Sequence, residues 1–253
     1  MIAGFAAGGA LIAVLSPRAA LLVCAGLDLV AALIFRYGLI RRAPRAVGRP
    51  SIGQTWRVNR QLWSHRARRA VYLALWVPNG LVVGCEALFM PYAGESAGVL
   101  FIAGALGMLA GDTLAGRFIP PGWRRGLELP LRMLLAAPYL LFALMLPLPV
   151  AVVAVTIASV GFAASLLLQE RLIALTPPDV KGQALGLHSS GMLTMQAVGA
   201  TLAGAVAEVL GAGAAMAVMA GASLLVTAAL IRPLRAPAPR PDVAETSALG
   251  SGA

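Results

Sequence analysis

The sequence predicts an all-α membrane protein with about eight transmembrane helices. Hydrophobic residues make up 59% of the 253 residues and charged residues only 12%, whereas a soluble domain carries about a quarter charged residues. About 20 apolar residues, each adding about 1.5 Å of helix, cover the hydrocarbon core of a bilayer. Predominantly apolar stretches occur at residues 1–15, 19–40, 70–92, 96–116, 127–146, 149–173, 184–208 and 212–231.

The distribution of basic residues predicts the orientation of these spans. Short turns with proline or glycine alternate with three basic connections, at residues 41–69, 117–125 and 176–182. Of the 20 lysine and arginine residues, Arg18 alone falls on the side of the short turns. Because short basic loops stay in the cytoplasm, we expect both termini to be cytoplasmic and the protein to lie in the plasma (inner) membrane of a bacterium.

The segments between and around the spans differ in character. Residues 1–15 give only about 22 Å of helix, less than the ~30 Å core, and look like the second half of a helix that begins upstream. The connection at 41–69 separates two spans from a block of six. Its part 56–69 combines tryptophan with arginine, which predicts a basic amphipathic helix on anionic lipid headgroups. The Pro/Ala-rich tail from Arg232 predicts disorder.

Three sequence patterns carry a resemblance to a known family. Residues 107–117 (GMLAGDTLAGR) form a glycine-rich helix end followed by Asp and Gly-Arg. The family's cytoplasmic motif has one residue fewer between Asp and Gly-Arg, and a basic residue where Thr113 stands. Residues 177–183 (PPDVKGQ) resemble its Pro-x-x-x-basic-Gly turn. A glycine-rich helix near the start of the chain contributes Gly4, Gly8 and Gly9.

With the order of the spans, these patterns resemble the major facilitator superfamily, whose transporters have twelve helices in two six-helix bundles. The chain would match helices five to twelve, as an N-terminally truncated member. The resemblance implies the last two helices of a first bundle at residues 1–42, a cytoplasmic loop at 43–69, a complete second bundle at 70–232 and a disordered cytoplasmic tail at 233–253. It also implies proton-coupled efflux of a small molecule by alternating access, with no enzymatic activity, cofactor or metal.

The resemblance marks a cytoplasmic gating motif at the end of the fourth span. Asp112 is expected beside Arg117 and the arginine pair at 124–125, because a carboxylate at that depth needs cationic or N–H partners. Contacts made in only one access state would bias the equilibrium between the states. A loop clamp without a gating role is the alternative. The motif comprises Gly107, Gly111, Asp112, Gly116 and Arg117.

Ionisable residues inside a bilayer are costly and therefore point to function. Glu86 is the strongest candidate, since it follows the helix-breaking sequence Pro78-Asn79-Gly80 in the third span. A broken helix beside a polar group is a common way for transporters to build a site near the midplane. Glu86 could carry a coupling proton or meet a cationic substrate. The alternative is a paired or protonated carboxylate near the outer surface.

Five other positions are weighed in the same way. Asp28, in the second span, either faces the opposite bundle or forms a polar pair between helices. His188 and Gln196 lie two turns apart and share roughly one face of the seventh span; His188 could relay protons or be a satisfied interface residue. Glu170 and Arg171 are expected in interfacial salt bridges rather than at a substrate site.

Several classes of protein are disfavoured. The chain has no nucleotide-binding loop, nucleophile elbow or metalloprotease helix. We assign its basic charge to topology and anionic lipids, not to nucleic acid. Cys24 and Cys85 are expected to be small buried residues, not a disulfide or metal site. A non-transporting fragment or scaffold remains the alternative function, and an intramembrane enzyme is disfavoured because the carboxylates are scattered.

Overall fold

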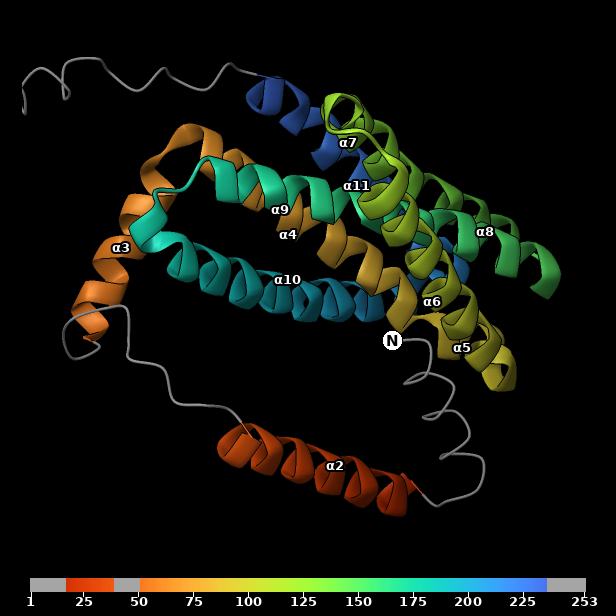
Figure 1. The fold of residues 1–253 in the computed structure, drawn as a ribbon. Coiled ribbons are helices and arrows are strands. Elements are labelled where there is room, and N and C mark those ends of the chain that lie inside the picture. Colours follow the sequence, from red (N-terminus) through yellow and green to blue (C-terminus); the bar gives the residue numbers. More distant parts are fainter. Residues whose placement is uncertain (1–16, 39–50, 236–253) are drawn as a thin grey trace, which may run out of the picture.

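The computed structural model describes residues 17–38 and 51–235 (Figure 1). All regular elements in these two ranges are helical, and neither range contains a strand. The predicted first span at 1–15, part of the long basic connection at 39–50 and the tail at 236–253 lie outside the described residues. The total of eight spans therefore stays a prediction.

Ten α-helices and five shorter turns follow one another in the described ranges. The α-helices are α2 (Pro17–Gly38), α3 (Ile52–Ser64), α4 (Arg66–Ala87), α5 (Phe89–Ala93), α6 (Ala97–Thr113), α7 (Pro121–Ala136), α8 (Leu148–Val160), α9 (Ala164–Ala174), α10 (Lys181–Leu210) and α11 (Ala212–Arg235). The turns are η1 (Gly94–Ser96), η2 (Leu114–Phe118), η3 (Ala137–Leu144), η4 (Gly161–Ala163) and η5 (Pro178–Val180); η2 is a π turn and the others are 3-10 turns.

Six helical segments of the described ranges are long and apolar enough to cross a membrane, which makes the chain an all-α membrane protein. They are Leu21–Gly38, Arg66–Phe118, Gly126–Leu144, Leu148–Ala174, Pro178–Leu210 and Ala212–Leu234. The second segment, of 53 residues, covers two predicted spans because α5 and η1 continue the helix between them. Gly94, with a φ of 54°, separates the two, since only glycine adopts this left-handed backbone readily.

Helix α4 is the centre of the bundle that α4 to α11 form. It packs most extensively on α10 and next on α11, and Figure 1 shows α4 (amber) beside α10 (teal to blue). The larger apolar core joins α4 and α5 to α6, η3, α8 and α11. The smaller core joins α3, α4, α9 and α10 through side chains such as Leu62, Leu75 and Leu172. Helix α3 thus lays its apolar side on the bundle, as an amphipathic helix does.

Glycines bring the backbones of α4 and α10 into direct contact. A Cβ atom on Gly199 would overlap the carbonyl oxygen of Gly80, and one on Gly84 would overlap the carbonyl oxygen of Gly199. A Cβ atom on Gly80 would in turn overlap the carbonyl group of Met195. Small residues allow such close packing where lipid gives helices no hydrophobic reason to associate. The crossing of α4 and α10 therefore depends on these three glycines.

Helix α2 lies apart from this bundle. All of its residues from 21 to 38 are exposed, and Figure 1 shows it separated from the other helices. It carries Cys24, so the expectation that both cysteines are buried is wrong for this one, whereas Cys85 is buried in α4. Both thiols are free.

We predict that Gly199→Ala destabilises the bundle by about 2–3 kcal/mol, because the added methyl group forces α4 and α10 apart. The matched control is Gly204→Ala on the same helix, where a Cβ atom meets no atom within 4 Å. Unfolding in mixed detergent and SDS micelles measures both free energies. Equal stability of the two variants would contradict the backbone contact.

Candidate functional site

An amide pair joins α4 to α10 within the membrane-spanning part of the bundle. The Nε2 atom of Gln196 donates a hydrogen bond to Oδ1 of Asn79 over 3.2 Å. Asn79 is 6% exposed, so its polar atoms depend on partners from the protein. Because buried amides without partners are costly, this pair fixes the register between the two helices. The structure thus brings together two residues that the sequence suggested separately.

The proline next to Asn79 is supported by α11. Pro78 lies inside α4 and has no N–H to donate. Its carbonyl oxygen accepts a hydrogen bond from the hydroxyl of Ser223 over 3.2 Å. Ser223 is fully buried. Three helices therefore meet beside Pro78, where polar backbone and side-chain groups lie together at membrane depth. The expected break at Pro78-Asn79-Gly80 is absent, because α4 continues as one α-helix to Ala87.

Glu86 lies on the same face of α4 as Asn79, two turns further along the helix. The residue is half-buried, and its electrostatic neighbours include Cys85 and Tyr139. The hydroxyl of Tyr139 is buried and has no hydrogen-bond partner among the described residues. No ion pair of Glu86 is present in this part of the chain. A single carboxylate thus stands between an apolar core and a buried phenol.

His188 faces the bundle beneath an aromatic cluster. Its backbone oxygen accepts a hydrogen bond from Nε1 of Trp76 over 3.0 Å, and Tyr72 donates to the carbonyl oxygen of Ala184 over 3.2 Å. The His188 side chain is buried, and its Nδ1 atom has no partner among the described residues. Trp63 stacks on Trp76 with ring centres 5.4 Å apart. His188 therefore borders this cluster and does not contact the amide pair.

Asp28 does not join these residues. It lies on α2, where every described position around it is exposed. The structure gives it neither of the two expected environments, a facing bundle or a polar pair. No group of three or more His, Cys, Asp or Glu side chains suited to a metal ion occurs in the described ranges.

The glycines of the predicted gating motif pack α6 against α8. A Cβ atom on Gly107 would overlap the carbonyl oxygen of Thr156, and one on Gly111 would overlap that of Val160. Gly116 and Arg117 follow in the exposed π turn. The two glycines thus let α6 and α8 approach as closely as α4 and α10 do.

Asp112 does not have the arginine partners that were expected for it. Asp112 is exposed and forms no ion pair with a described side chain, whereas Arg124 pairs with Glu170 of α9. The physical reason is that Arg124 lies on α7, which packs on α9. The carboxylate of Asp112 therefore remains open to solvent or headgroups.

The helix after Asp112 ends in the π turn η2. The backbone N–H of Ile119 donates to the carbonyl oxygen of Leu114 over 3.2 Å, a bond across five residues. Gly116 and Arg117 of the predicted motif lie in this turn, which continues the helix to Phe118.

A charged clamp joins α7, α9 and α11 at the end of the bundle that carries the basic connections. Arg171 pairs with Glu128 over 3.1 Å and also donates to the carbonyl oxygen of Leu234. Arg132 is 3% exposed, reaches the hydroxyl of Thr227 over 3.5 Å and interacts electrostatically with Glu128. We define the clamp as Arg124, Glu128, Arg132, Glu170 and Arg171.

Sequence reasoning placed Glu170 and Arg171 in salt bridges and missed the α7 side of the clamp. A signal was present, since Glu128 and Arg132 are four residues apart inside the predicted span 127–146, a spacing that puts both on one face. This spacing does not show which helix the two residues face.

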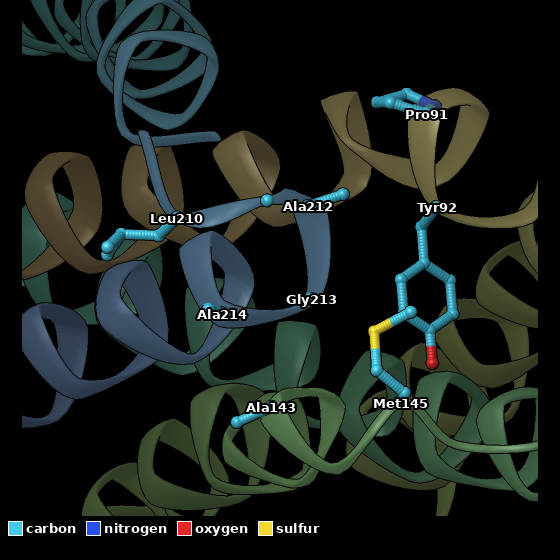
Figure 2. A pocket seen from close by; sticks show the side chains of 9 residues that line it. Pro91, Tyr92, Ala143, Met145, Leu210, Ala212, Gly213 and Ala214 are labelled. Carbon is cyan, nitrogen blue, oxygen red and sulfur yellow. The ribbon is translucent and has the colours of Figure 1, made fainter. Parts of the chain in front are cut away.

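Two hollows mark the ends of the bundle. An apolar hollow of about 260 Å³ lies between α5 and the turn from α10 to α11. Figure 2 shows Tyr92, Met145 and Leu210 among the residues that line it. The hydroxyl of Tyr92 is bonded to the carbonyl oxygen of Leu146, so this hollow offers alkyl surface. At the other end, a groove of about 370 Å³ between α3 and α10 has mostly polar lining residues, including Asn59 and Gln183.

The comparisons with known proteins add no relative: no family model, no characterised protein and no solved structure matches the chain.

We predict that Glu128→Gln destabilises the bundle by about 3 kcal/mol, since Arg132 and Arg171 then lack their shared carboxylate. Adding Arg132→Met to Glu128→Gln restores part of this loss, because it removes the buried cation. The control, Glu95→Gln in the exposed turn η1, changes stability by less than about 0.5 kcal/mol. If the double variant is no more stable than Glu128→Gln in SDS unfolding, Arg132 does not depend on Glu128.

We predict that acid loosens the start of α4. His65 caps this helix by accepting the backbone N–H of Arg68 at Nδ1 over 3.4 Å. Burial, and secondarily the Arg68 cation, lower the pKa of His65. As the pH falls, the imidazole of His65 therefore takes up a proton more readily in the uncapped helix than in the capped one. Capping is complete above about pH 6.5 and weakens as the pH falls below that value.

Protection factors for amide exchange at residues 67–69 measure this effect. We expect lower protection at pH 5.5 than at pH 7.5 in the native chain. His65→Asn keeps a capping side chain that does not titrate, so its protection should be the same at both pH values. Unchanged protection in the native chain would refute the role of His65.

Proposed function

We propose that the chain is a secondary active transporter of the major facilitator type, which exports a small molecule by alternating access coupled to protons. In this proposal α4 to α11 correspond to the second six-helix bundle of that family. The protein lies in the plasma (inner) membrane with both termini in the cytoplasm. The basic ends of α3, α4 and α9 then face the anionic headgroups of the inner leaflet.

The observation that carries the proposal is the way in which two groups of three spans, here called triples, pack on each other. The first triple is α4, α6 and α7 with their turns, and the second is α8 with α9, α10 and α11. Helix α4 packs mainly on α10 and α11, whereas α8 packs on α6 and α7. Each leading helix thus packs on the last two helices of the other triple. An odd number of spans inverts the second triple, and inverted repeats of three helices are the internal repeats of this family's bundles.

Glycine contacts support the same internal repeat. Gly80 of α4 meets α10 at Met195, and Gly111 of α6 meets α8 at Val160. In both cases a glycine lets the leading helix of one triple touch the backbone of a helix from the other. Two such crossings hold the two triples together, so that the bundle can move as one body against a second bundle, as alternating access requires.

The polar face of α4 supplies a place for substrate and proton. Pro78 lies inside the continuous helix α4, Asn79 offers an amide, and Glu86 offers a carboxylate that can gain or lose a proton. An intramembrane carboxylate without an ion partner changes its charge at a smaller cost than one held in a salt bridge. We assign Glu86 to proton coupling, and Asn79 with Gln196 to substrate binding.

We predict that Glu86→Gln abolishes transport driven by a proton gradient while the protein still inserts and folds. Proteoliposomes with the native chain should accumulate at least one dye from a panel of cationic, neutral and anionic fluorescent dyes when a pH gradient is imposed. Glu86→Gln should fall to the level of empty vesicles, and Glu95→Gln should match the native chain.

Two results would decide against this account. Unchanged accumulation by Glu86→Gln would remove Glu86 from the mechanism. If the native chain, shown to be folded in the vesicles, moves no dye of the panel, a non-transporting membrane scaffold becomes the better description.

A further inference from the structure

Helix α10 carries a polar stripe on the side that faces away from the bundle. Its buried residues, such as His188, Gly199 and Ala203, lie on one side. On the opposite side, positions at intervals of three, four or seven residues share one face. We define the polar stripe as Gln183, Gly186, Ser190, Thr194, Thr201 and Glu208. It extends over about 38 Å, more than the ~30 Å hydrocarbon core.

Lipid tails are an unsuitable neighbour for this stripe. The hydroxyls of Ser190, Thr194 and Thr201 bond back to carbonyl oxygens of their own helix over 2.9 to 3.0 Å. The hydroxyl oxygens keep lone pairs that hydrocarbon cannot satisfy. Transmembrane helices place Gly, Ser and Thr against other helices, where these residues allow close packing and hydrogen bonds. The polar stripe therefore fits a helix better than lipid.

Helix α2 presents a matching face. The three charged residues of α2, which are Arg18, Asp28 and Arg36, recur with Leu21, Ala25 and Ala32 at intervals of three or four residues. This spacing puts all six on one side of the helix. The carboxylate of Asp28 stands near the middle of a 22-residue apolar helix, where charge is costly without a partner. Residues 21–38 are nevertheless exposed.

The two faces are complementary when the helices run antiparallel with their ends level. Arg18, in the first turn of α2, then lies opposite Glu208, in the last turn of α10. Asp28 lies about 15 Å further along α2, and Thr201 and Thr194 lie about 10 and 21 Å before Glu208. The carboxyl group therefore falls between the two hydroxyl oxygens. Because each hydroxyl already donates to a carbonyl oxygen of α10, either oxygen can accept a hydrogen bond from the protonated carboxyl group.

The chain connectivity favours the antiparallel direction. Residues 39–50 link the end of α2 to the start of α3, and 13 steps from Gly38 to Ser51 reach at most about 45 Å. Near its start α3 is held to the beginning of α10, because Nε2 of Gln183 donates to the carbonyl oxygen of Thr55 and to Oδ1 of Asn59, both over 3.0 Å. The antiparallel direction places the end of α2 at the beginning of α10 and so leaves residues 39–50 the shorter distance to span.

We infer that α2 packs antiparallel on the polar stripe of α10 within the same chain. Arg18 pairs with Glu208 in this contact. Asp28, in its protonated form, donates a hydrogen bond to the hydroxyl oxygen of Thr194 or Thr201. The contact joins α2 to the six-helix bundle, and it holds whether or not the protein transports, so its test is independent of any dye.

Disulfide trapping in native membranes tests the contact with the full chain. Cys24→Ser and Cys85→Ser remove the native thiols, and a protease site inserted in the 39–50 connection separates α2 from the rest. The pair Leu21→Cys with Ala205→Cys spans the inferred contact without touching its charges or hydroxyls. The control pair uses Val23→Cys with Ala205→Cys, since Val23 lies at nearly the same level on the opposite side of α2.

We expect the first pair to hold the cleaved halves together after mild oxidation and the control pair to release them. A disulfide-linked dimer in place of the internal bond would assign the stripe to a second copy and overturn the inference. Release of both pairs, or equal trapping of both, would also overturn it.

Charge reversal gives a second readout on the same pair. Arg18→Glu should lower the disulfide yield about fivefold, which corresponds to about 1 kcal/mol. Adding Glu208→Arg to Arg18→Glu should restore the yield. Equal yields in all three proteins would show that the ion pair does not hold α2 on α10.

Discussion

The backbone contact between α4 and α10 is the constraint on which the rest of this bundle depends. Without side chains at Gly80 and Gly199 the two helices touch, and only at that distance can Gln196 reach Asn79. Ser223 of α11 bonds to the carbonyl oxygen of Pro78 beside this pair. Hydrocarbon supplies no water to these polar groups, so the close crossing of α4 and α10 makes the polar segment of α4 tolerable in the membrane.

Polar groups in the described part of the chain are of two kinds. The charged clamp lies at the basic end, where Glu128 and Glu170 each have an arginine partner, and such paired charges stabilise one arrangement of helices. Glu86 and Asp28 have no such partner among the described residues, and they lie deeper in their spans. A charge that only stabilises the fold keeps one ion partner. A group that takes part in a transport cycle must be able to change its partner or its protonation state.

Periodicity and composition predict the helices well but not which helices meet. The spans from 19–40 onward all fall on observed helices, because apolar length is a local property. By contrast, the pairing of Arg124 with Glu170 joins residues 46 positions apart, and Asn79 and Gln196 are 117 apart. Such contacts depend on helix packing, which a single sequence does not specify.

In the proposed transporter, the α4 face with Asn79 and Glu86 borders a water path that opens to alternate sides. Val83 lies between them on this face, so the most direct measurement is labelling of Val83→Cys, in a chain without its native thiols, by a membrane-impermeant maleimide in oriented vesicles. The account predicts labelling from one side under one proton gradient and from the other side when the gradient is reversed. Labelling from neither side under both gradients would contradict it.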